Sequence, residues 1–306
     1  MVAQLALIGF GEAATAFAPG LDAAMIAYDI KSDRHRLANV AMAATNAEAL
    51  SGAAAALSLV TADQSLAAAE AAASHIAPGA FWFDMNSVAP DTKRAAAAAI
   101  EAAGGRHVDV AIMSPVLPQR AAVPLLLSGP HAEAGAELLR SIGFGSVRVV
   151  PGETGRASSI KMIRSVMVKG IEALIAECVI AADRAGVLDE VIASLNASWP
   201  GVDWAQKADY NLDRMMIHGL RRAAEMEEVV KTLDTLGTGA AMTRGTVERQ
   251  RAIGELGLTP EPGLGAKLKA VTPAKAGVST LQSAPTRQKT PAFAEVTDVG
   301  MTESAK

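Results

Sequence analysis

Two glycines near the start of the chain have the spacing of a phosphate-binding turn. The apolar run 5–8 leads directly into residues 9–14, which fit the pattern G-x-G-x-x-A. In such a turn the first glycine allows a sharp bend, the second leaves room for phosphate oxygens, and the small third residue lets a helix lie close to the strand. The start of that helix can hold a pyrophosphate through its free N–H groups. The sequence therefore predicts a dinucleotide-binding turn at six residues: Gly9, Phe10, Gly11, Glu12, Ala13 and Ala14.

An acidic residue lies where the ribose of a bound dinucleotide would be recognised. Asp29 stands 20 residues beyond Gly9 and closes the second apolar run. A carboxylate at this position accepts hydrogen bonds from the ribose hydroxyls and repels a 2′-phosphate, which favours NAD. Lys31 and Arg34 follow closely and could accommodate that phosphate, so NADP stays open. The alternative interpretation is an ordinary β-turn-α unit with an aspartate at a strand end.

Polar residues also follow three further predicted strands, at the edge where α/β sheets bind their ligands. Thr61 and Ser87 are candidates for cofactor contacts, and Asn86 and Ser114 are candidates for substrate contacts. Asn86 and Ser87 can also cap the helix that Pro90 begins, because both residue types suit a helix N-terminus. Ser114 can simply bridge a Ser-Pro turn.

Lys161 is the candidate general acid and base. Lys161, Arg164 and Ser165 share one helical stripe with Lys169 and Glu172, in a helix that is otherwise largely apolar. Cations at a domain junction are costly unless they face a polar cleft, where a lysine of lowered pKa can exchange a proton with a hydroxyl. We expect Arg164 and Ser165 to contact the substrate, with Arg164 clamping a carboxylate. The alternatives are a solvated face for the stripe and an ion pair with an acidic side chain for Arg164.

Alternation of short apolar runs with Ala-rich helical patterns predicts the scaffold of the first half of the chain. Strands are expected at 4–8, 25–29, 57–60, 80–84, 107–111, 124–128 and 146–150, and helices at 13–21, 33–44, 67–76, 89–103 and 132–142. Such alternation is typical of an α/β fold of the Rossmann type, a doubly wound, mostly parallel sheet covered on both faces. The later strands follow one another closely, which indicates an antiparallel or mixed edge. Residues 1–151 are therefore expected to form a dinucleotide-binding domain.

The pattern becomes helical after a Pro-Gly-Glu-Thr-Gly segment at 151–155. A first helix is expected from Ala157 to about Ala185, closing at Gly186 as a C-cap, with others at 188–198, 204–217, 223–236 and 241–253. Residues 152–258 are thus expected to be an all-α domain for substrate binding and dimerisation. The first helix is long enough to link two domains or to build a dimer interface. The composition of residues 259–306 predicts a flexible tail, with an arm that docks on a partner subunit as the alternative.

Composition narrows the class of protein further. A chain of 306 residues is long enough for two domains, and a net charge of −4 gives no electrostatic reason to expect a nucleic-acid partner. The five histidines and Cys178 are not at metal-ligand spacing, so no metal site is expected. The single cysteine cannot form an intrachain disulfide, and neither a signal peptide nor a membrane span is visible. We expect a cytoplasmic protein that binds a small-molecule substrate.

Taken together, these motifs resemble the β-hydroxyacid dehydrogenases, the group of 3-hydroxyisobutyrate and tartronate-semialdehyde enzymes related to 6-phosphogluconate dehydrogenase. The resemblance covers roughly residues 2–256 and looks closest to a branch whose C-terminal domain was catalogued as a domain of unknown function. The glycine turn matches the family's cofactor motif. Residues 84–90 match its Asp-x-Ser-Thr-x-x-Pro segment, with Asn86 and Ser87 in place of Ser-Thr. Lys161, preceded by Gly155, falls on the family's catalytic lysine.

The departures from the family pattern concern the substrate. The family's Asp-Ala-Pro-Val-Ser-Gly-Gly loop is replaced by Asp-Val-Ala-Ile-Met-Ser-Pro at 109–115, and Ala157 stands in place of a glycine. The Asn usually found three residues after the lysine is Arg164. A C-terminal Lys-Asp that reaches the cofactor has no clear match, with Arg221 and Arg222 as candidates for its place. Because the carboxylate-binding loop is altered, the family's substrates are not carried over to this chain.

We therefore expect a homodimeric NAD(P)-dependent oxidoreductase acting on a small hydroxyl-bearing substrate, with a hydroxy acid as the expected class. The nicotinamide would exchange a hydride with the carbinol carbon, and Lys161 would act as general acid and base. One alternative is an imine reductase of the same architecture, a class that generally lacks the lysine. The other is a dinucleotide-binding protein without catalytic activity, because fold does not dictate function.

Overall fold

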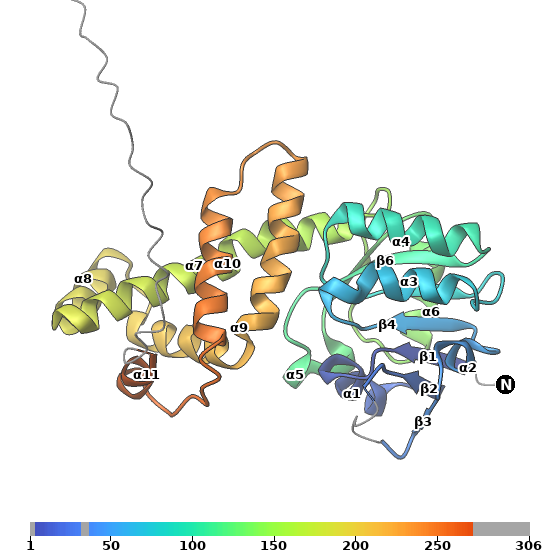
Figure 1. The fold of residues 1–306 in the computed structure, drawn as a ribbon, viewed down its shortest axis with the longest axis horizontal. Helices are drawn as coiled ribbons and strands as arrows, with labels where there is room; N and C mark the ends of the chain where they lie inside the picture. Colours follow the sequence, from blue (N-terminus) through green and yellow to red (C-terminus); the bar gives the residue numbers. More distant parts are fainter. Residues whose placement is uncertain (1–3, 32–36, 272–306) are drawn as a thin grey trace, which may run out of the picture.

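The computed structural model describes residues 4–31 and 37–271, which form a sheet covered by helices and a separate helical part (Figure 1). Within these residues the sheet has eight strands in the order β3-β2-β1-β4-β5-β6-β7-β8. All neighbouring strands are parallel except β6 and β7, which confirms the predicted mixed edge. The strands are β1 Gln4–Ile8, β2 Ala24–Tyr28, β3 Val40–Met42, β4 Ala55–Ser58, β5 Phe81–Asp84, β6 Arg106–Ile112, β7 Leu125–Ser128 and β8 Val147–Val149.

Alternate residues of β1, an inner strand of the sheet, enter two different cores. Leu5 and Leu7 of β1 pack into a cluster rich in phenylalanine, whereas Ala6 and Ile8 pack into a cluster built mainly from alanines around Trp82. A strand that is apolar on both faces belongs inside a sheet covered on both sides. The covering elements are α1 Glu12–Phe17, η1 Ala18–Gly20, α2 Asn46–Leu50, η2 Ala62–Gln64, α3 Ser65–Ala73, α4 Pro90–Ala102, α5 Val116–Gln119, η3 Arg120–Ala122 and α6 Ala132–Ser141.

One predicted helix is wrong. Residues 33–44 were expected to be helical, but Val40–Met42 form β3, and residues 33–36 lie outside the described part of the chain. Val40 pairs with Met25 of β2, so tertiary pairing at the sheet edge overrides the local helical pattern. The helix comes later, at Asn46–Leu50, where the Thr45 hydroxyl accepts a hydrogen bond from the Glu48 N–H and caps the first turn.

The helical part consists of α7 Arg156–Ala185, α8 Leu188–Ser198, α9 Trp204–Thr235, α10 Ala241–Gly254 and α11 Leu264–Val271. Helix α7 ends at Gly186, whose φ of 70° confirms the predicted C-cap. The two helices predicted at 204–217 and 223–236 are instead one continuous helix, α9. Gly219 in its middle marks a close helix crossing, because a Cβ there would lie 2.4 Å from the carbonyl oxygen of Gln250 on α10.

The expected tail does not begin at Thr259. Residues 264–271 form α11, which packs Leu268 against the core of the helical part. Its Lys267 donates to Asp209 Oδ1 at 2.8 Å and lies 3.3 Å from Asp213 Oδ1, both on α9. These carboxylates raise the pKa of Lys267 although burial opposes them. Residues 272–306, which hold the remainder of that prediction, lie outside the described residues.

Within the described ranges no helix combines the length and apolar character needed to cross a bilayer. The same ranges hold no group of three or more His, Cys, Asp or Glu side chains arranged to bind a metal ion.

Candidate active site

The glycine turn has the predicted geometry. Gly9 follows β1 with a φ of +89°, and a Cβ on it would lie 2.7 Å from the Leu59 carbonyl oxygen, so only glycine fits. Gly11 precedes α1, and a Cβ there would meet no atom within 4 Å, which leaves open space beside the turn. Ala14 is fully buried against the sheet, whereas Glu12 is exposed and Ala13 is half-buried. The turn thus leaves open space beside Gly11 at the start of a helix.

Asp29 directly follows β2 and its side chain lies against this turn. One carboxylate oxygen accepts the Phe10 N–H at 2.8 Å, and the other accepts the Lys31 N–H at 2.8 Å. The structure therefore brings together the acidic residue and the glycine turn that the sequence paired. Thr61 is exposed just beyond β4, directly before η2. Arg34, the second candidate for a phosphate contact, lies outside the described residues.

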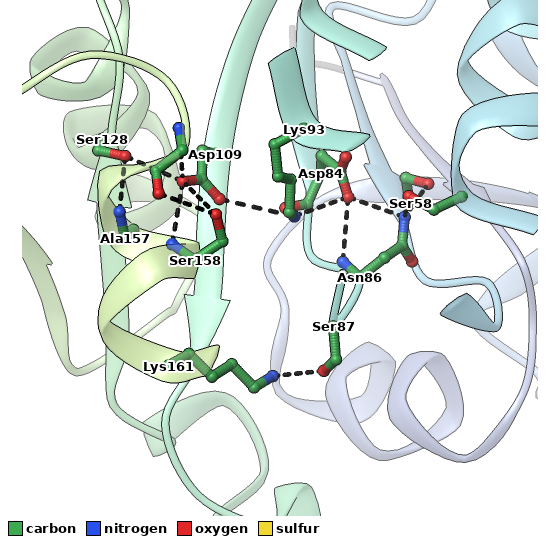
Figure 2. Close-up of polar contacts among 12 residues, drawn as sticks. Ser58, Asp84, Asn86, Ser87, Lys93, Asp109, Ser128, Ala157, Ser158 and Lys161 are labelled. Carbon is green, nitrogen blue, oxygen red and sulfur yellow. Dashed lines mark hydrogen bonds and ion pairs between the residues drawn. The ribbon is translucent and has the colours of Figure 1, made fainter. Parts of the chain in front are cut away.

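Asn86 and Ser87, adjacent in the loop after β5, point to different partners (Figure 2). The Asn86 amide is buried and donates to Ser58 Oγ at 2.9 Å, Ser65 Oγ at 3.1 Å and Asp84 Oδ1 at 2.8 Å. Its side chain therefore holds the loop to β4 and α3. Ser87 is half-buried and accepts a hydrogen bond from Lys161.

Lys161 reaches across from α7 to this loop. Its Nζ lies 2.5 Å from Ser87 Oγ, so the candidate general acid and base meets a candidate cofactor contact (Figure 2). Burial lowers the pKa of Lys161 to about 8, and the nearby cations Lys169, Lys93 and Arg221 act in the same direction, whereas Glu225 opposes them. An amine of that pKa is present in both protonation states near neutral pH, as a proton-exchanging group requires.

Glu225 of α9 is the anion beside this lysine. Burial alone would raise its pKa, but Lys169, Arg221 and Lys161 outweigh burial and hold the pKa at about 2. Lys169 donates to Glu225 at 2.6 Å, and Arg221 lies 3.4 Å away. The stripe predicted on α7 is thus divided: Lys161 faces the loop of Ser87, and Lys169 is paired inside the helical part. Glu172 is likewise paired there with Arg222 and Gln250.

Asp109, on β6, holds the beginning of α7. Its buried Oδ2 accepts the Gly155 and Ser158 N–H groups, each at 3.1 Å, and the Ser128 hydroxyl at 3.0 Å. Ser128 Oγ in turn accepts the Ala157 N–H at 2.9 Å. A carboxylate among the free N–H groups of a helix N-terminus is favourable, because it satisfies them and complements the helix dipole. Lys161 lies one turn beyond Ser158, so Asp109 fixes the part of α7 from which the Lys161 side chain extends.

A fully buried lysine that the sequence analysis missed joins β5 and β6. Lys93 of α4 donates to Asp84 Oδ1 at 2.8 Å and lies 3.6 Å from Asp109 Oδ1. Burial opposes ionisation of Asp84, but Lys93 and His107 outweigh it and lower the pKa of that carboxyl. The signal was present in the sequence, since Ala96, Ala97 and Ile100 put Lys93 on the apolar face of the predicted helix.

Comparisons with known proteins identify the family to which the chain belongs. The chain is 36% identical to a conserved hypothetical protein from Sinorhizobium meliloti 1021, with a TM-score of 0.69 over 89% of this chain and 97% of that one. It is 29% identical to a conserved protein of unknown function whose structure is described as similar to 3-hydroxyacid dehydrogenases, with a TM-score of 0.59 over 82% of this chain and 99% of that one. The chain belongs to the β-hydroxyacid dehydrogenase-like superfamily.

Three further comparisons concern parts of the chain or its fold. Residues 182–253 match the family model described as a domain of unknown function, DUF1932. A 3-hydroxyisobutyrate dehydrogenase of Mycobacterium tuberculosis shares the fold at 14% identity, with a TM-score of 0.68 over 89% of this chain and 99% of that one. An uncharacterized 28.5 kDa protein of Methanothermus fervidus is 27% identical over 150 residues, which span 49% of this chain and 57% of that protein.

The positions where this chain departs from the superfamily pattern have different surroundings. Arg164 is exposed and has no hydrogen-bond or ion-pair partner among the described residues, so the ion pair that was the alternative to a substrate contact is absent there. Ser165 donates to the Lys161 carbonyl at 2.9 Å within α7, and Ser114 donates to Gln119 at 2.8 Å. Of the two arginine candidates for the family's Lys-Asp, Arg222 is buried against Glu172, whereas Arg221 is half exposed beside Glu225.

Proposed function

We propose that this protein is an NAD(P)-dependent oxidoreductase that acts on a small hydroxy acid, with Lys161 as general acid and base. The observation that carries the proposal is the 2.5 Å contact of Lys161 Nζ with Ser87 Oγ, at a lysine whose pKa is about 8. Membership of the superfamily supports the oxidoreductase class. The hydroxy-acid substrate rests on the cationic surroundings of Lys161 and on the Arg164 guanidinium, which has no partner among the described residues.

The glycine turn fits a dinucleotide cofactor. The open space at Gly11 would admit phosphate oxygens, and Asp29 lies close enough to the turn to meet the ribose hydroxyls. From the turn toward Lys161, the dinucleotide would pass four predicted contact residues: Glu12, Ala13, Thr61 and the half-buried Ser87. When bound, the nicotinamide would exchange a hydride with the substrate carbon. Asp29 favours NAD over NADP, because its charge repels a 2′-phosphate.

The proton step belongs to Lys161. In oxidation the neutral amine takes the proton of the substrate hydroxyl as the carbinol carbon loses its hydride. In reduction the ammonium returns that proton to the carbonyl oxygen. Ser87 accepts a hydrogen bond from Lys161 Nζ and orients the amine, and Glu225 stabilises the ammonium form. With a pKa of about 8, a cost of only about 1.4 kcal/mol per pH unit separates the two forms.

The acid group of the substrate would meet cations on α7. Arg164 lies one turn beyond Lys161 and has no partner within the described ranges, so its guanidinium is available for a bidentate contact with a carboxylate. Ser114 and Ser165 would lie at the edge of that contact. Asn86, predicted to contact substrate, is assigned a supporting role instead, because its amide donates to three protein oxygens.

Turnover assays with a panel of hydroxy acids, their keto or semialdehyde counterparts and cyclic imines, each with NAD and NADP, test this function. We expect nicotinamide absorbance to change with a hydroxy acid and NAD. Lys161→Met should lose turnover by about a thousandfold, within the usual range for a proton-transfer group, and still bind cofactor. Turnover of imines alone, or cofactor binding without any turnover, would replace this function by one of the two alternatives.

We further propose that two copies associate along α7. Large apolar side chains recur on its exposed surface at Ile163, Met167, Ile171 and Leu174. The spacing of four, four and three residues makes them one stripe, and contiguous exposed apolar patches mark interaction sites. A second copy would cover this stripe beside Arg164. The cytoplasm is the proposed compartment, in keeping with the single cysteine.

A further inference from the structure

Two buried carboxylates cross between the sheet part and the helical part in opposite directions. Asp109, from the sheet, accepts N–H groups of Gly155 and Ser158 at the start of α7. Glu228, from α9, accepts the Ala89 N–H at 2.8 Å and the Thr92 hydroxyl at 3.2 Å at the start of α4. Asp109 is fully buried and Glu228 is 5% exposed. Each part therefore supplies an anion to a helix N-terminus of the other.

Both anchors lie next to the Ser87–Lys161 pair. Ala89 is two residues beyond Ser87, so Glu228 fixes the end of the loop that presents the hydroxyl. Ser158 is three residues before Lys161, so Asp109 fixes the turn that presents the amine. Lys93, one turn into α4, connects the two ends by contacting both Asp84 and Asp109. Figure 2 shows Asp109, Lys93 and Asp84 along one side of the loop and helix that carry the pair.

We propose that Asp109 and Glu228 are positioning residues for Lys161, which hold its amine against Ser87 by anchoring α7 and α4 reciprocally. The proposal rests on the function assigned to Lys161 above. Neither carboxylate touches the reacting atoms; each acts through a backbone N–H. Displacement of a catalytic group by about 1 Å is enough to slow a reaction about a hundredfold. Two anchors from opposite sides would resist such displacement better than one.

A purely structural role makes a different prediction. Loss of an ordinary helix cap lowers stability and leaves the surroundings of a remote side chain unchanged. Loss of a positioning contact would release Lys161 toward solvent. Its burial and the charges that face it, Glu225 and Arg221 on α9, Lys169 on α7 and Lys93 on α4, would then act on it less strongly. The amine would titrate closer to an ordinary lysine.

Competitive labelling of the whole protein with trace acetic anhydride over a pH series measures this without any substrate. The Lys161 peptide is quantified by mass spectrometry in the wild type, Glu228→Ala, Glu228→Gln and Asp109→Asn. Thr235→Val is the matched control. The Thr235 hydroxyl of α9 donates to Asp91 of α4 at 2.9 Å, so it joins the same two helices as Glu228 but does not contact the Ser87 loop. Circular dichroism establishes that each variant is folded.

We expect Lys161 to titrate near 8 in the wild type and about one unit or more higher in Glu228→Ala and Asp109→Asn. Glu228→Gln keeps an acceptor for the Ala89 N–H and should recover most of the wild-type value, and Thr235→Val should not differ from it. An unchanged Lys161 titration in folded Glu228→Ala overturns the proposal. If Asp109→Asn does not fold, the comparison of Glu228→Ala with Glu228→Gln tests the proposal alone. A shift in a protein that turns over no substrate supports the positioning role while rejecting the proposed function.

Discussion

Ser87 Oγ and Lys161 Nζ lie 2.5 Å apart although 74 residues separate them in the chain. Ser87 follows β5 at the carboxyl edge of the sheet, and Lys161 occupies the second turn of the helix that leaves the sheet part. The contact thus connects the dinucleotide-binding side of the fold with the helical part. In this contact the Lys161 amine donates a hydrogen bond to the Ser87 hydroxyl oxygen.

Removal of the Ser87 hydroxyl should slow the reaction without abolishing it. A hydrogen bond to a charged group contributes about 1.5–3 kcal/mol, so Ser87→Ala should lower kcat by about ten- to a hundredfold. Ser159→Ala is the control, because Ser159 donates to the Gly155 carbonyl on the same helix and does not contact Ser87. Steady-state kinetics with saturating cofactor measures both. Equal losses in the two variants would mean that the Ser87 contact has no role in the reaction.

Two substitutions on α9 should move the pKa of Lys161 in opposite directions. Glu225 raises it and Arg221 lowers it, so Glu225→Gln should shift the pH dependence of turnover below about 8, and Arg221→Gln should shift it above. We expect about half a unit to one unit in each case, as is usual for partly buried neighbours. A pH–rate series on both variants provides the measurement. Shifts in the same direction would show that the charges near Lys161 do not control its titration.

Asp29 should determine the choice of cofactor. Asp29→Asn keeps an acceptor for the Phe10 N–H while removing the charge that repels a 2′-phosphate. The preference for NAD over NADP, measured as the ratio of kcat/KM, should fall about tenfold, which corresponds to about 1.4 kcal/mol. An unchanged ratio would contradict the role given to Asp29. Titration of each cofactor by fluorescence separates binding from turnover.

The exposed stripe of α7 should control association. A charge in a buried apolar contact is strongly unfavourable, so Leu174→Glu should convert a dimer to a monomer. Met242→Glu on α10 is the control, since Met242 is 76% exposed and lies outside the stripe. Light scattering after size exclusion gives the mass of each species. A monomeric wild type, or a dimer that survives Leu174→Glu, would contradict association through α7.

Local patterns in the sequence were enough to predict the glycine turn and the position of Asp29 beside it, because each lies at a predictable step from an element boundary. The same holds for α7, whose glycine C-cap is a local signal. Lys161 was singled out by the charged stripe on its helix and by the family resemblance. The strand at Val40–Met42 was not found, since only its pairing with β2 distinguishes it from a helical segment. Whether residues 218–222 break or continue α9 depends on the close crossing of Gly219 with α10, which no local pattern records.

The supporting residues of the site required three-dimensional information of another kind. Asp109 was visible as a charged residue inside an apolar strand, but its partners at the start of α7 lie more than 40 residues away. Asn86 has the residue type of a ligand contact, but its amide donates to the hydroxyls of Ser58 and Ser65, which lie 28 and 21 residues away in the chain. Helix α11 was missed because Leu268 is buried in a cluster with residues of α7, α9 and α10, which are distant in the sequence.

The pH dependence of kcat/KM for oxidation, compared between the wild type and Lys161→Met, tests the central claim most directly. Because the neutral amine is the base, the wild-type rate should rise with pH and level off above an apparent pKa of about 8, and the reduction should show the opposite limb. Lys161→Met should retain cofactor binding, lose most of the rate and lack this limb. A limb of the same pKa in Lys161→Met would contradict the assignment of Lys161 as acid and base.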